Sequence, residues 1–194
     1  LSEQYEVPVI VRMTTRVCHV KAMVTVAGQR TEHAAAGFQK NPQRWVMTPA
    51  NAKPRLPVMH QRERQLQALS ETSDLNLSFA GSDRRIGFVT SGPAFMHVRE
   101  TFPNAPVLKL GFSCPPPLEK IRAFAGQVDT LVVVEETEPL LETEIRAAGL
   151  EVRGKDILPR WGELAPSVLR PAIKPLLGEP YQVSTRPQSS VFPR

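Results

Sequence analysis

Three stretches decide the fold of this chain: IGFVTSG at residues 86–92, VLKLGFSCPPPLEKIRAFAGQ at 107–127 and TLVVVEETEPLLETEIRAAGLEVRGKDILPRWGEL at 130–164. Each stretch starts with a short apolar run rich in Val, Leu or Ile, and an amphipathic segment follows it. Strands that alternate with helices in this way are typical of a parallel sheet built from βαβ units. The sequence therefore predicts an α/β domain with an open, mostly parallel βαβ sheet over residues 84–174.

The apolar runs of this domain predict strands at 85–89, 106–110, 130–134 and 150–152, with helices after the first three and a last helix at 163–173. Pro93, Pro117 and Pro139 each suit the start of a helix, because the first helical N–H needs no partner. Gly149 suits the position just after a helix end. A short edge strand is permitted near residues 75–79, where Leu and Phe alternate with polar residues.

The remaining residues predict three further parts. Residues 1–28 look like the end of another domain, because the β-branched run at 7–11 suits a strand and residues 20–26 suit a second one. Residues 29–83 are a proline-broken connector, without regular structure before residue 58 and with one exposed helix at 58–69. Residues 175–194 predict a Pro-rich linker to a downstream domain. Because the chain begins inside an expected strand, we expect it to be a piece of a longer polypeptide.

The chain has 194 residues, a formal net charge of +5, 41% hydrophobic and 22% charged residues, which is typical of a soluble globular protein. The sequence has neither an apolar run of membrane-spanning length nor a basic signal-peptide start, so we expect a cytoplasmic protein. Its basic residues are scattered and have few aromatic neighbours, which argues against nucleic acid as a partner. Cys18 and Cys114 lie far apart without metal-ligand spacing, and we expect reduced thiols.

Glu135 and Glu136 follow the third strand, at the edge of a parallel sheet where ligands usually bind. One of them could contact a ligand or a neighbouring subunit. Alternatively, they could accept hydrogen bonds from backbone amides at the start of the helix that Pro139 opens, where the helix dipole favours an anion. Ser91 and Gly92 follow the first strand and could bind a small anion, although neither dinucleotide nor P-loop glycine patterns are present.

Arg12, Arg16 and His19 gather positive charge in the segment VRMTTRVCH. Arginine forks suit carboxylates and phosphates, so a 2-oxoacid or a diphosphate could bind there. In a strand, Arg12 and Arg16 would share one face with Thr14. The alternative is a set of salt bridges between domains or subunits. Cys114 precedes a helix start and is predicted to have a structural role.

Several motifs, in this order and spacing, resemble the alpha subunit of indolepyruvate ferredoxin oxidoreductase, in the thiamine-diphosphate-dependent 2-oxoacid:ferredoxin oxidoreductase family. They are PVIVRMTTRVCH at 8–19, NPQRWVMTPAN at 41–51, IGFVTSGPAFMHV at 86–98, VLKLGFSCPPP at 107–117, VDTLVVVEETEPLLE at 128–142 and GKDILPRWGELAP at 154–166. The resemblance covers most of residues 7–170. It departs from the family at Cys114, where an aromatic residue is more usual.

The resemblance implies that residues 1–28 end a pyrimidine-binding domain and that residues 84–174 are a transketolase C-terminal-like domain. The full enzyme would oxidatively decarboxylate an aryl-2-oxoacid with coenzyme A and pass electrons through iron–sulfur clusters to ferredoxin. Its thiamine diphosphate, Mg²⁺ and cluster ligands would lie outside this chain, so no catalytic, cofactor or metal ligand is expected here. The segment would be a non-catalytic scaffold, inactive alone, that contacts other domains of its subunit and a second subunit in an oligomer.

The sequence is also compatible with two other hypotheses. The chain could belong to another thiamine enzyme of the transketolase or 2-oxoacid dehydrogenase type. It could also be a stand-alone module that binds a small anion through Ser91 or Glu136. Under either hypothesis the substrate is unspecified, because specificity depends on sites that a fold does not determine.

Overall fold

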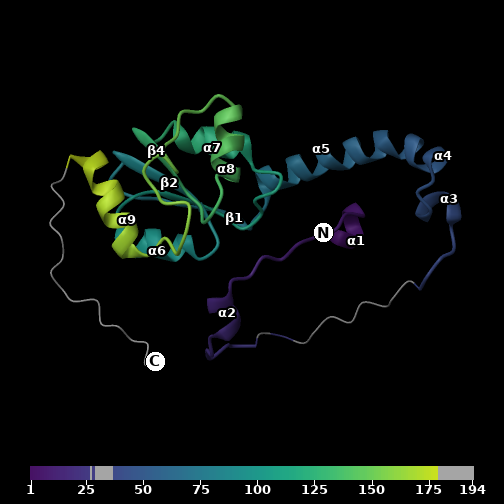
Figure 1. The fold of residues 1–194 in the computed structure, drawn as a ribbon, viewed down its shortest axis with the longest axis horizontal. Coiled ribbons are helices and arrows are strands. Elements are labelled where there is room, and N and C mark those ends of the chain that lie inside the picture. Colours follow the sequence, from purple (N-terminus) through teal and green to yellow (C-terminus); the bar gives the residue numbers. More distant parts are fainter. Residues whose placement is uncertain (27, 29–36, 179–194) are drawn as a thin grey trace. The chain divides into compact units, whose positions relative to one another are not determined.

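Four short segments of the chain form one sheet with the strand order β1-β3-β2-β4. The computed structural model describes residues 1–26, 28 and 37–178 (Figure 1). The strands are β1 (Asn76–Phe79), β2 (Ile86–Ser91), β3 (Val107–Leu110) and β4 (Thr130–Val134). β2 pairs in parallel with both β3 and β4, whereas β1 pairs antiparallel with β3 at the edge. The predictions of an open, mostly parallel sheet and of a short edge strand are therefore confirmed.

Three helices follow the parallel strands, as the sequence predicts: α6 (Ala94–Thr101), α7 (Leu118–Ala125) and α8 (Leu140–Ala147). Pro93, Pro117 and Pro139 occupy the N-cap position in turn, so each lies one residue before its helix instead of opening it. Gly149 follows the end of α8 with a φ of 79°, a backbone conformation that glycine adopts at little cost.

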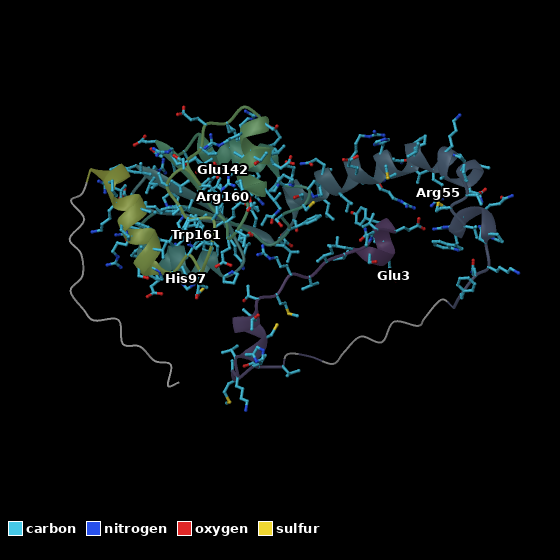
Figure 2. All side chains as sticks on the ribbon, in the orientation of Figure 1. Glu3, Arg55, His97, Glu142, Arg160 and Trp161 are labelled. Carbon is cyan, nitrogen blue, oxygen red and sulfur yellow. The ribbon has the colours of Figure 1, made fainter. Side chains whose placement is uncertain are left out.

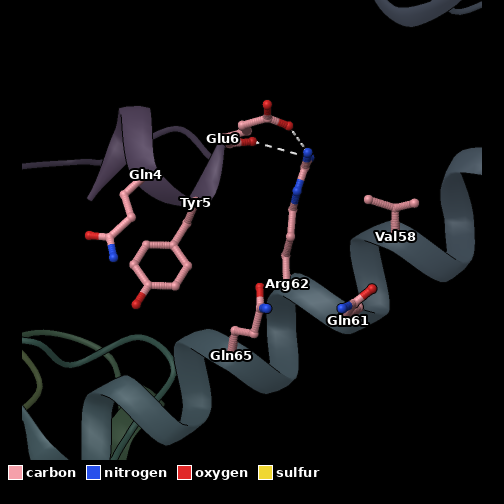
Figure 3. A pocket seen from close by; sticks show the side chains of 7 residues that line it. All are labelled: Gln4, Tyr5, Glu6, Val58, Gln61, Arg62 and Gln65. Atoms are coloured by element: carbon pink, nitrogen blue, oxygen red, sulfur yellow. Dashed lines mark hydrogen bonds and ion pairs between the residues drawn. The ribbon is translucent and has the colours of Figure 1, made fainter.

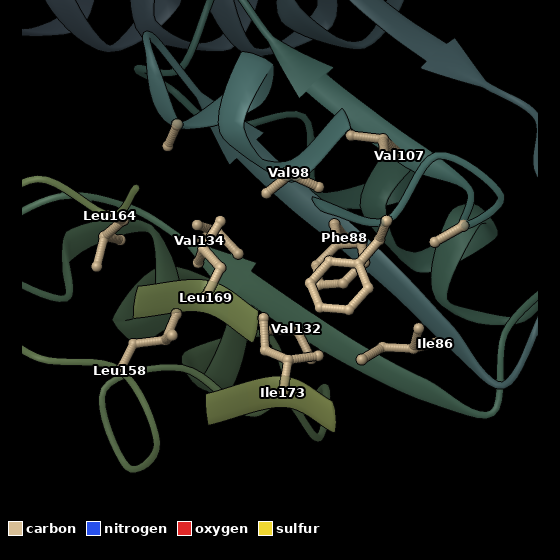
Figure 4. Packing of buried hydrophobic residues seen from close by; sticks show 13 residues of the cluster. Ile86, Phe88, Val98, Val107, Val132, Val134, Leu158, Leu164, Leu169 and Ile173 are labelled. Carbon is tan, nitrogen blue, oxygen red and sulfur yellow. The ribbon is translucent and has the colours of Figure 1, made fainter. Parts of the chain in front are cut away.

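The sheet separates two apolar layers because side chains alternate along its strands. One cluster contains Phe88 and Val132 and is completed by residues of α6 and α9 (Pro166–Ile173), among them Leu169 and Ile173 (Figure 4). The cluster on the other face contains Val89, Val133 and residues of α7 and α8. The strands are thus covered on both faces, which explains their continuous hydrophobic runs.

The expected fourth strand at 150–152 is absent. Only Arg153 pairs with the outer side of β4, through its N–H to Leu131 O at 2.9 Å and its C=O to Val133 N at 2.8 Å. The last helix is shorter than predicted, since α9 starts at Pro166, and a short 3₁₀ helix, η2 (Lys174–Leu177), follows it. The linker predicted at 175–194 falls mostly outside the described residues.

The chain divides into two compact units, Leu1–Leu66 and Gln67–Arg194, and both apolar clusters belong to the second. The boundary falls inside α5 (Leu56–Thr72). This helix confirms the one predicted at residues 58–69 and is longer than predicted at both ends. The prediction of irregular structure before residue 58 is wrong. Short helices occur there with a proline in the first turn, where a helix tolerates one: α3 (Pro42–Trp45), α4 (Pro49–Ala52) and η1 (Lys53–Arg55).

The strands predicted in residues 1–28 are also wrong. Residues 7–11 have no strand partner, α1 (Ser2–Tyr5) precedes them, and α2 (Thr15–His19) contains two of the three basic residues, Arg16 and His19. A strand exists only when a neighbouring strand satisfies its backbone, and no described residue of this unit does so. Among the described residues, no helix is long and apolar enough to cross a membrane.

Candidate functional site

The carboxyl ends of the parallel strands bring the predicted edge residues together. Ser91, at the end of β2, pairs with Leu110 at the end of β3, and Thr90 pairs with Val134 at the end of β4. The Thr90 hydroxyl donates to Val134 O at 2.8 Å, which ties β2 to β4 at this edge. Ser91 ends β2 and Glu135 follows β4, so both lie at the edge where open α/β sheets usually bind ligands.

The Glu135 carboxylate is buried and accepts two hydrogen bonds from the start of α8. Leu141 N donates to Oε2 and Glu142 N donates to Oε1, both at 2.9 Å. Pro139, the N-cap residue, supplies no side-chain acceptor of its own. Glu135 thus satisfies amides that the helix leaves unpaired, and its charge lies at the positive end of the helix dipole. The sequence leaves two interpretations of Glu135 open, contact with a ligand or subunit and hydrogen bonds to backbone amides. The observed contacts match the second.

Glu136 differs from its neighbour. It is half-buried and, among the described residues, no hydrogen bond reaches its side chain. Burial lowers the pKa of Lys155, and Glu136 is one of several nearby carboxylates whose charges partly oppose this. Glu136 is therefore the carboxylate of this pair that remains available to an outside partner.

Lys155 is a member of the site that sequence reasoning passed over. Its Nζ donates to Glu135 O at 2.5 Å and to Pro159 O at 3.1 Å. Burial lowers the pKa of Lys155, and the nearby carboxylates, Glu135 first, partly oppose that shift. The lysine stands between the end of β4 and the following loop, so it joins two backbone segments that are distant in sequence.

Glu142 binds the same loop from α8. Its Oε2 accepts from Lys155 N at 2.8 Å, and its Oε1 pairs with Arg146 at 2.9 Å. A Cβ placed on Gly154 would lie 2.2 Å from Glu142 Oε2, so this approach requires glycine. The segment GKD at 154–156 is thereby held against the first turn of α8.

The loop that carries Arg160 and Trp161 crosses the same edge (Figure 2). Arg160 forms an ion pair of 3.7 Å with Glu138, in the turn between β4 and α8. On the other side of Trp161, Glu163 lies 2.8 Å from His97 of α6. This chain thus covers part of its own sheet edge, and polar atoms of that edge are used for internal contacts.

Ser91 and Gly92 form the turn between β2 and the start of α6. Gly92 has a φ of 61°, which allows the chain to turn sharply from β2 into the helix. Phe95 N and Met96 N donate to Gly92 O and Pro93 O at 3.2 and 3.1 Å, so these amides are engaged within the turn. The anion-binding interpretation of Ser91 stays a prediction.

Arg12, Arg16 and His19 belong to the first unit, whereas the sheet belongs to the second. Arg12 lies in the irregular segment before α2, and Arg16 and His19 lie within that helix. The prediction that Arg12, Thr14 and Arg16 share one face of a strand is therefore wrong. Instead, the Thr14 side chain caps α2 by accepting from Val17 N at 3.5 Å. Their proposed role in binding an anion or another domain stays a prediction.

Two shallow cavities lie in the first unit. One has a volume of about 270 Å³, and Glu6 beside it accepts a hydrogen bond from Arg62 (Figure 3). Glu6 also pairs with Arg44, whose guanidinium lies 4.7 Å from the ring centre of Trp45 beside a second cavity of about 500 Å³. Since this unit has no fully buried hydrophobic residue among those described, neither cavity has the apolar enclosure usual for a small-molecule site.

Cys18 and Cys114 are both exposed free thiols. Cys114 lies in a proline-rich loop that α5 holds, since the Ser70 hydroxyl donates to Pro115 O at 2.7 Å. In the part of the chain that the structure describes, His, Cys, Asp and Glu side chains form no group able to hold a metal ion.

Comparison with known proteins gives a consistent result. The chain is 37% identical to the indolepyruvate oxidoreductase subunit IorA of Methanothermobacter thermautotrophicus, over 93% of this chain and 31% of that subunit. It is 34% identical to the IorA subunit of Methanothermobacter marburgensis and 28% identical to that of Pyrococcus horikoshii, in each case over 92% of this chain. No family model matches the sequence.

A solved structure shows the same fold at lower sequence similarity. The 2-oxoglutarate:ferredoxin oxidoreductase from Magnetococcus marinus, solved with 2-oxoglutarate, coenzyme A and succinyl-CoA bound, superposes with a TM-score of 0.53 and 16% identity. The match covers 68% of this chain and 24% of that one. The chain is therefore homologous to a segment of the indolepyruvate oxidoreductase subunit IorA and spans about a third of that subunit's length.

Proposed function

We propose that the chain is a non-catalytic, interface-forming segment of a thiamine-diphosphate-dependent 2-oxoacid:ferredoxin oxidoreductase. The observation that carries the proposal is the similarity to IorA subunits over 92 to 93% of the chain, although the match spans only 30 to 31% of each subunit. A segment of this size would act together with the other domains of its subunit, a second subunit and ferredoxin, in a cytoplasmic oligomer.

In this proposal the full enzyme oxidatively decarboxylates an aryl-2-oxoacid such as indolepyruvate, with coenzyme A as acyl acceptor. Thiamine diphosphate supplies the electron sink for decarboxylation, and its ligands come from domains outside this chain. Residues 1–28 end the pyrimidine-binding domain, and residues 84–174 are the transketolase C-terminal-like domain. Residues 29–83 connect the two, and residues 175–194 lead to a downstream domain.

The internal contacts of the sheet edge support a scaffold role. Glu135, Glu142 and Lys155 are three groups whose chemistry would suit acid–base work, and each is engaged by backbone atoms of the same chain. Their bonds hold α8 and the loop after Arg153 in place. Side chains with such partners are suited to fixing the shape of a surface.

Residues 7–26 support the interface role. Several large apolar side chains of this segment are exposed, and Ile10 is 90% exposed and Met23 fully exposed. Contiguous exposed apolar residues usually mark a contact surface. In the proposal, the rest of the pyrimidine-binding domain covers them, and Arg12, Arg16 and His19 contribute ion pairs to that contact or face the diphosphate or substrate carboxylate.

The proposal is tested on the full-length subunit, assembled with its second subunit, and on the 194-residue chain. We expect the assembled enzyme to reduce methyl viologen when given indolepyruvate and coenzyme A. We expect the chain alone to bind no thiamine diphosphate in calorimetry, with or without Mg²⁺. Tight Mg²⁺-dependent binding by the chain alone would overturn the non-catalytic role. Activity of the assembled enzyme with lipoamide in place of viologen would instead indicate a 2-oxoacid dehydrogenase.

A further inference from the structure

The indole of Trp161 is 79% exposed, although the loop that carries it is fixed on both sides. Before it, Ile157 N and Leu158 N donate to Gly154 O at 3.0 and 2.9 Å, and the Leu158 side chain is buried. After it, the Leu164 side chain is fully buried in the same apolar cluster. The exposure of Trp161 is thus a property of a well-anchored loop.

Two side-chain contacts connect this loop to the elements on either side of it. Arg160 reaches Glu138 in the turn before α8, and Glu163 reaches His97 on α6. The segment from Arg160 to Glu163 therefore runs from the start of α8 to α6, along the carboxyl edge of the sheet (Figure 2). Trp161 projects from the middle of that segment.

Two more exposed apolar side chains belong to the same edge. Met96 in the first turn of α6 is 65% exposed, and Leu140, the first residue of α8, is 75% exposed. Charged residues of both signs lie close by in the chain: Glu136 and Glu138 precede Leu140, and Arg160 pairs with Glu138. An aromatic anchor with apolar neighbours and a charged rim is the usual composition of a protein interface.

We propose that Trp161 is the anchor through which this edge docks against another domain of the same polypeptide. The inference rests on the proposed function, in which the chain belongs to a longer subunit. The match covers 31% of the IorA subunit of Methanothermobacter thermautotrophicus, so about two thirds of that subunit lies outside the matched segment. A domain on the same polypeptide binds at a high effective concentration, so a small anchor suffices. A second copy of the chain would need a well-formed patch of roughly 800 Å² per partner, more than three side chains provide.

The test compares the 194-residue chain with the full-length subunit. Both are exposed briefly to hydroxyl radicals, with a reporter peptide to normalise the dose, and oxidation is measured by peptide mass spectrometry. We expect oxidation of Trp161 to fall at least about fivefold in the full-length subunit, because docking excludes water from an interface anchor. Equal oxidation of Trp161 in the two proteins would overturn the inference.

Two variants separate docking from folding. Trp161→Ala is expected to leave the melting temperature of the 194-residue chain unchanged, because the side chain is exposed. In the full-length subunit it is expected to raise the oxidation of Met96 and Leu140, since the docked domain loosens. Leu77→Ala, on the edge strand β1 where Leu77 is partly exposed, is the control and is expected to leave the oxidation of Met96 and Leu140 unchanged. Failure of Trp161→Ala to expose Met96 and Leu140 would overturn the anchor role.

Protection of Trp161 that appears in the 194-residue chain and grows with its concentration would assign the surface to a second copy and overturn the inference. Viologen reduction by the same full-length preparation reports on the proposed function separately. An active enzyme with an oxidisable Trp161 would overturn the docking inference alone. A natural gene product no longer than the 194-residue chain would overturn both.

Discussion

The carboxylate of Glu142 lies against the backbone of Gly154 with no room for a side chain between them. A Cβ on Gly154 would come within 2.2 Å of Glu142 Oε2 and 2.6 Å of its carboxyl carbon. The same carboxylate accepts from Lys155 N and pairs with Arg146, so it cannot turn away without losing those bonds. This close approach ties the loop that follows Arg153, the residue that pairs with β4, to helix α8.

Gly154→Ala is expected to destabilise the α/β unit by about 2 kcal/mol, in the range that overpacking of a fixed site costs. Urea unfolding followed by circular dichroism measures the change. Gly126→Ala is the matched control, because the nearest atoms to a Cβ there lie 3.8 Å away. A Gly154→Ala variant as stable as the Gly126→Ala variant would show that Glu142 moves freely.

Glu135→Gln is expected to cost about 1 kcal/mol of stability, because α8 loses a charged acceptor for its first amides. Glutamine keeps the size of the side chain, but only one of its two terminal atoms is an acceptor. Its NH₂ group would therefore face one of the two backbone N–H donors without a hydrogen bond. Glu136→Gln, one residue away and without a hydrogen bond from the described residues, is the control and is expected to change little. Equal stabilities of the two variants in thermal unfolding would contradict the capping role of Glu135.

The sheet could be predicted because the information is local. The residues of β4 form an unbroken apolar run, and Pro139 lies where a helix must start, so both the strand and the nearby partner of Glu135 follow from adjacent residues. The run at 150–152 looked alike, yet only Arg153 pairs with β4, because strand length depends on how far a neighbour runs alongside. Residues 7–11 have strand composition without a strand partner, which a pattern alone does not reveal.

The contacts of the loop at 153–164 could not be predicted for a different reason. Lys155 reaches Glu135 across 20 residues, and Glu142 reaches Lys155 N across 13. These bonds exist because α8 returns the chain to the edge of β4, which is a property of the tertiary fold. The segment GKD, which closely follows a strand and a helix, is the one sequence feature that points to this loop. Its partners lie on other elements, so the segment alone does not identify them.

Asp156 is expected to make stability depend on acid pH. Burial by itself raises the pKa of Asp156, but hydrogen bonds from Gly154 N and from Arg153 outweigh it, so the pKa lies below the ordinary value of 3.8. The unfolded chain then binds more protons than the native one as the pH falls. The stabilising contribution is present above pH 3.8 and is lost as the pH drops through the lower native pKa.

Asp156→Asn is therefore expected to be less stable than the natural sequence at pH 7, and the difference is expected to shrink as the pH falls below 3.8. The carboxylate is partly exposed, so the difference is modest and salt weakens it. Urea midpoints at several pH values measure it. A difference that is constant down to pH 2.5, or that grows as the pH falls, would contradict the lowered pKa.

Residues 56–178 are expected to fold without the first 55 residues. Both apolar clusters lie within this range, and α5 contributes Ser70 and Glu71, whose side chains bond to Pro115 O and to the amides of Glu119 and Lys120 at the start of α7. The fragment therefore keeps the contacts that hold the sheet and its helices. Its thermal midpoint is expected to lie within about 3 °C of that of the 194-residue chain, since the removed residues include no fully buried hydrophobic side chain among those described.

A fragment that starts at residue 73 is the control: it loses Ser70 and Glu71 and is expected to melt several degrees lower. If the fragment 56–178 were unfolded, the first unit would carry stability that its exposed side chains do not indicate.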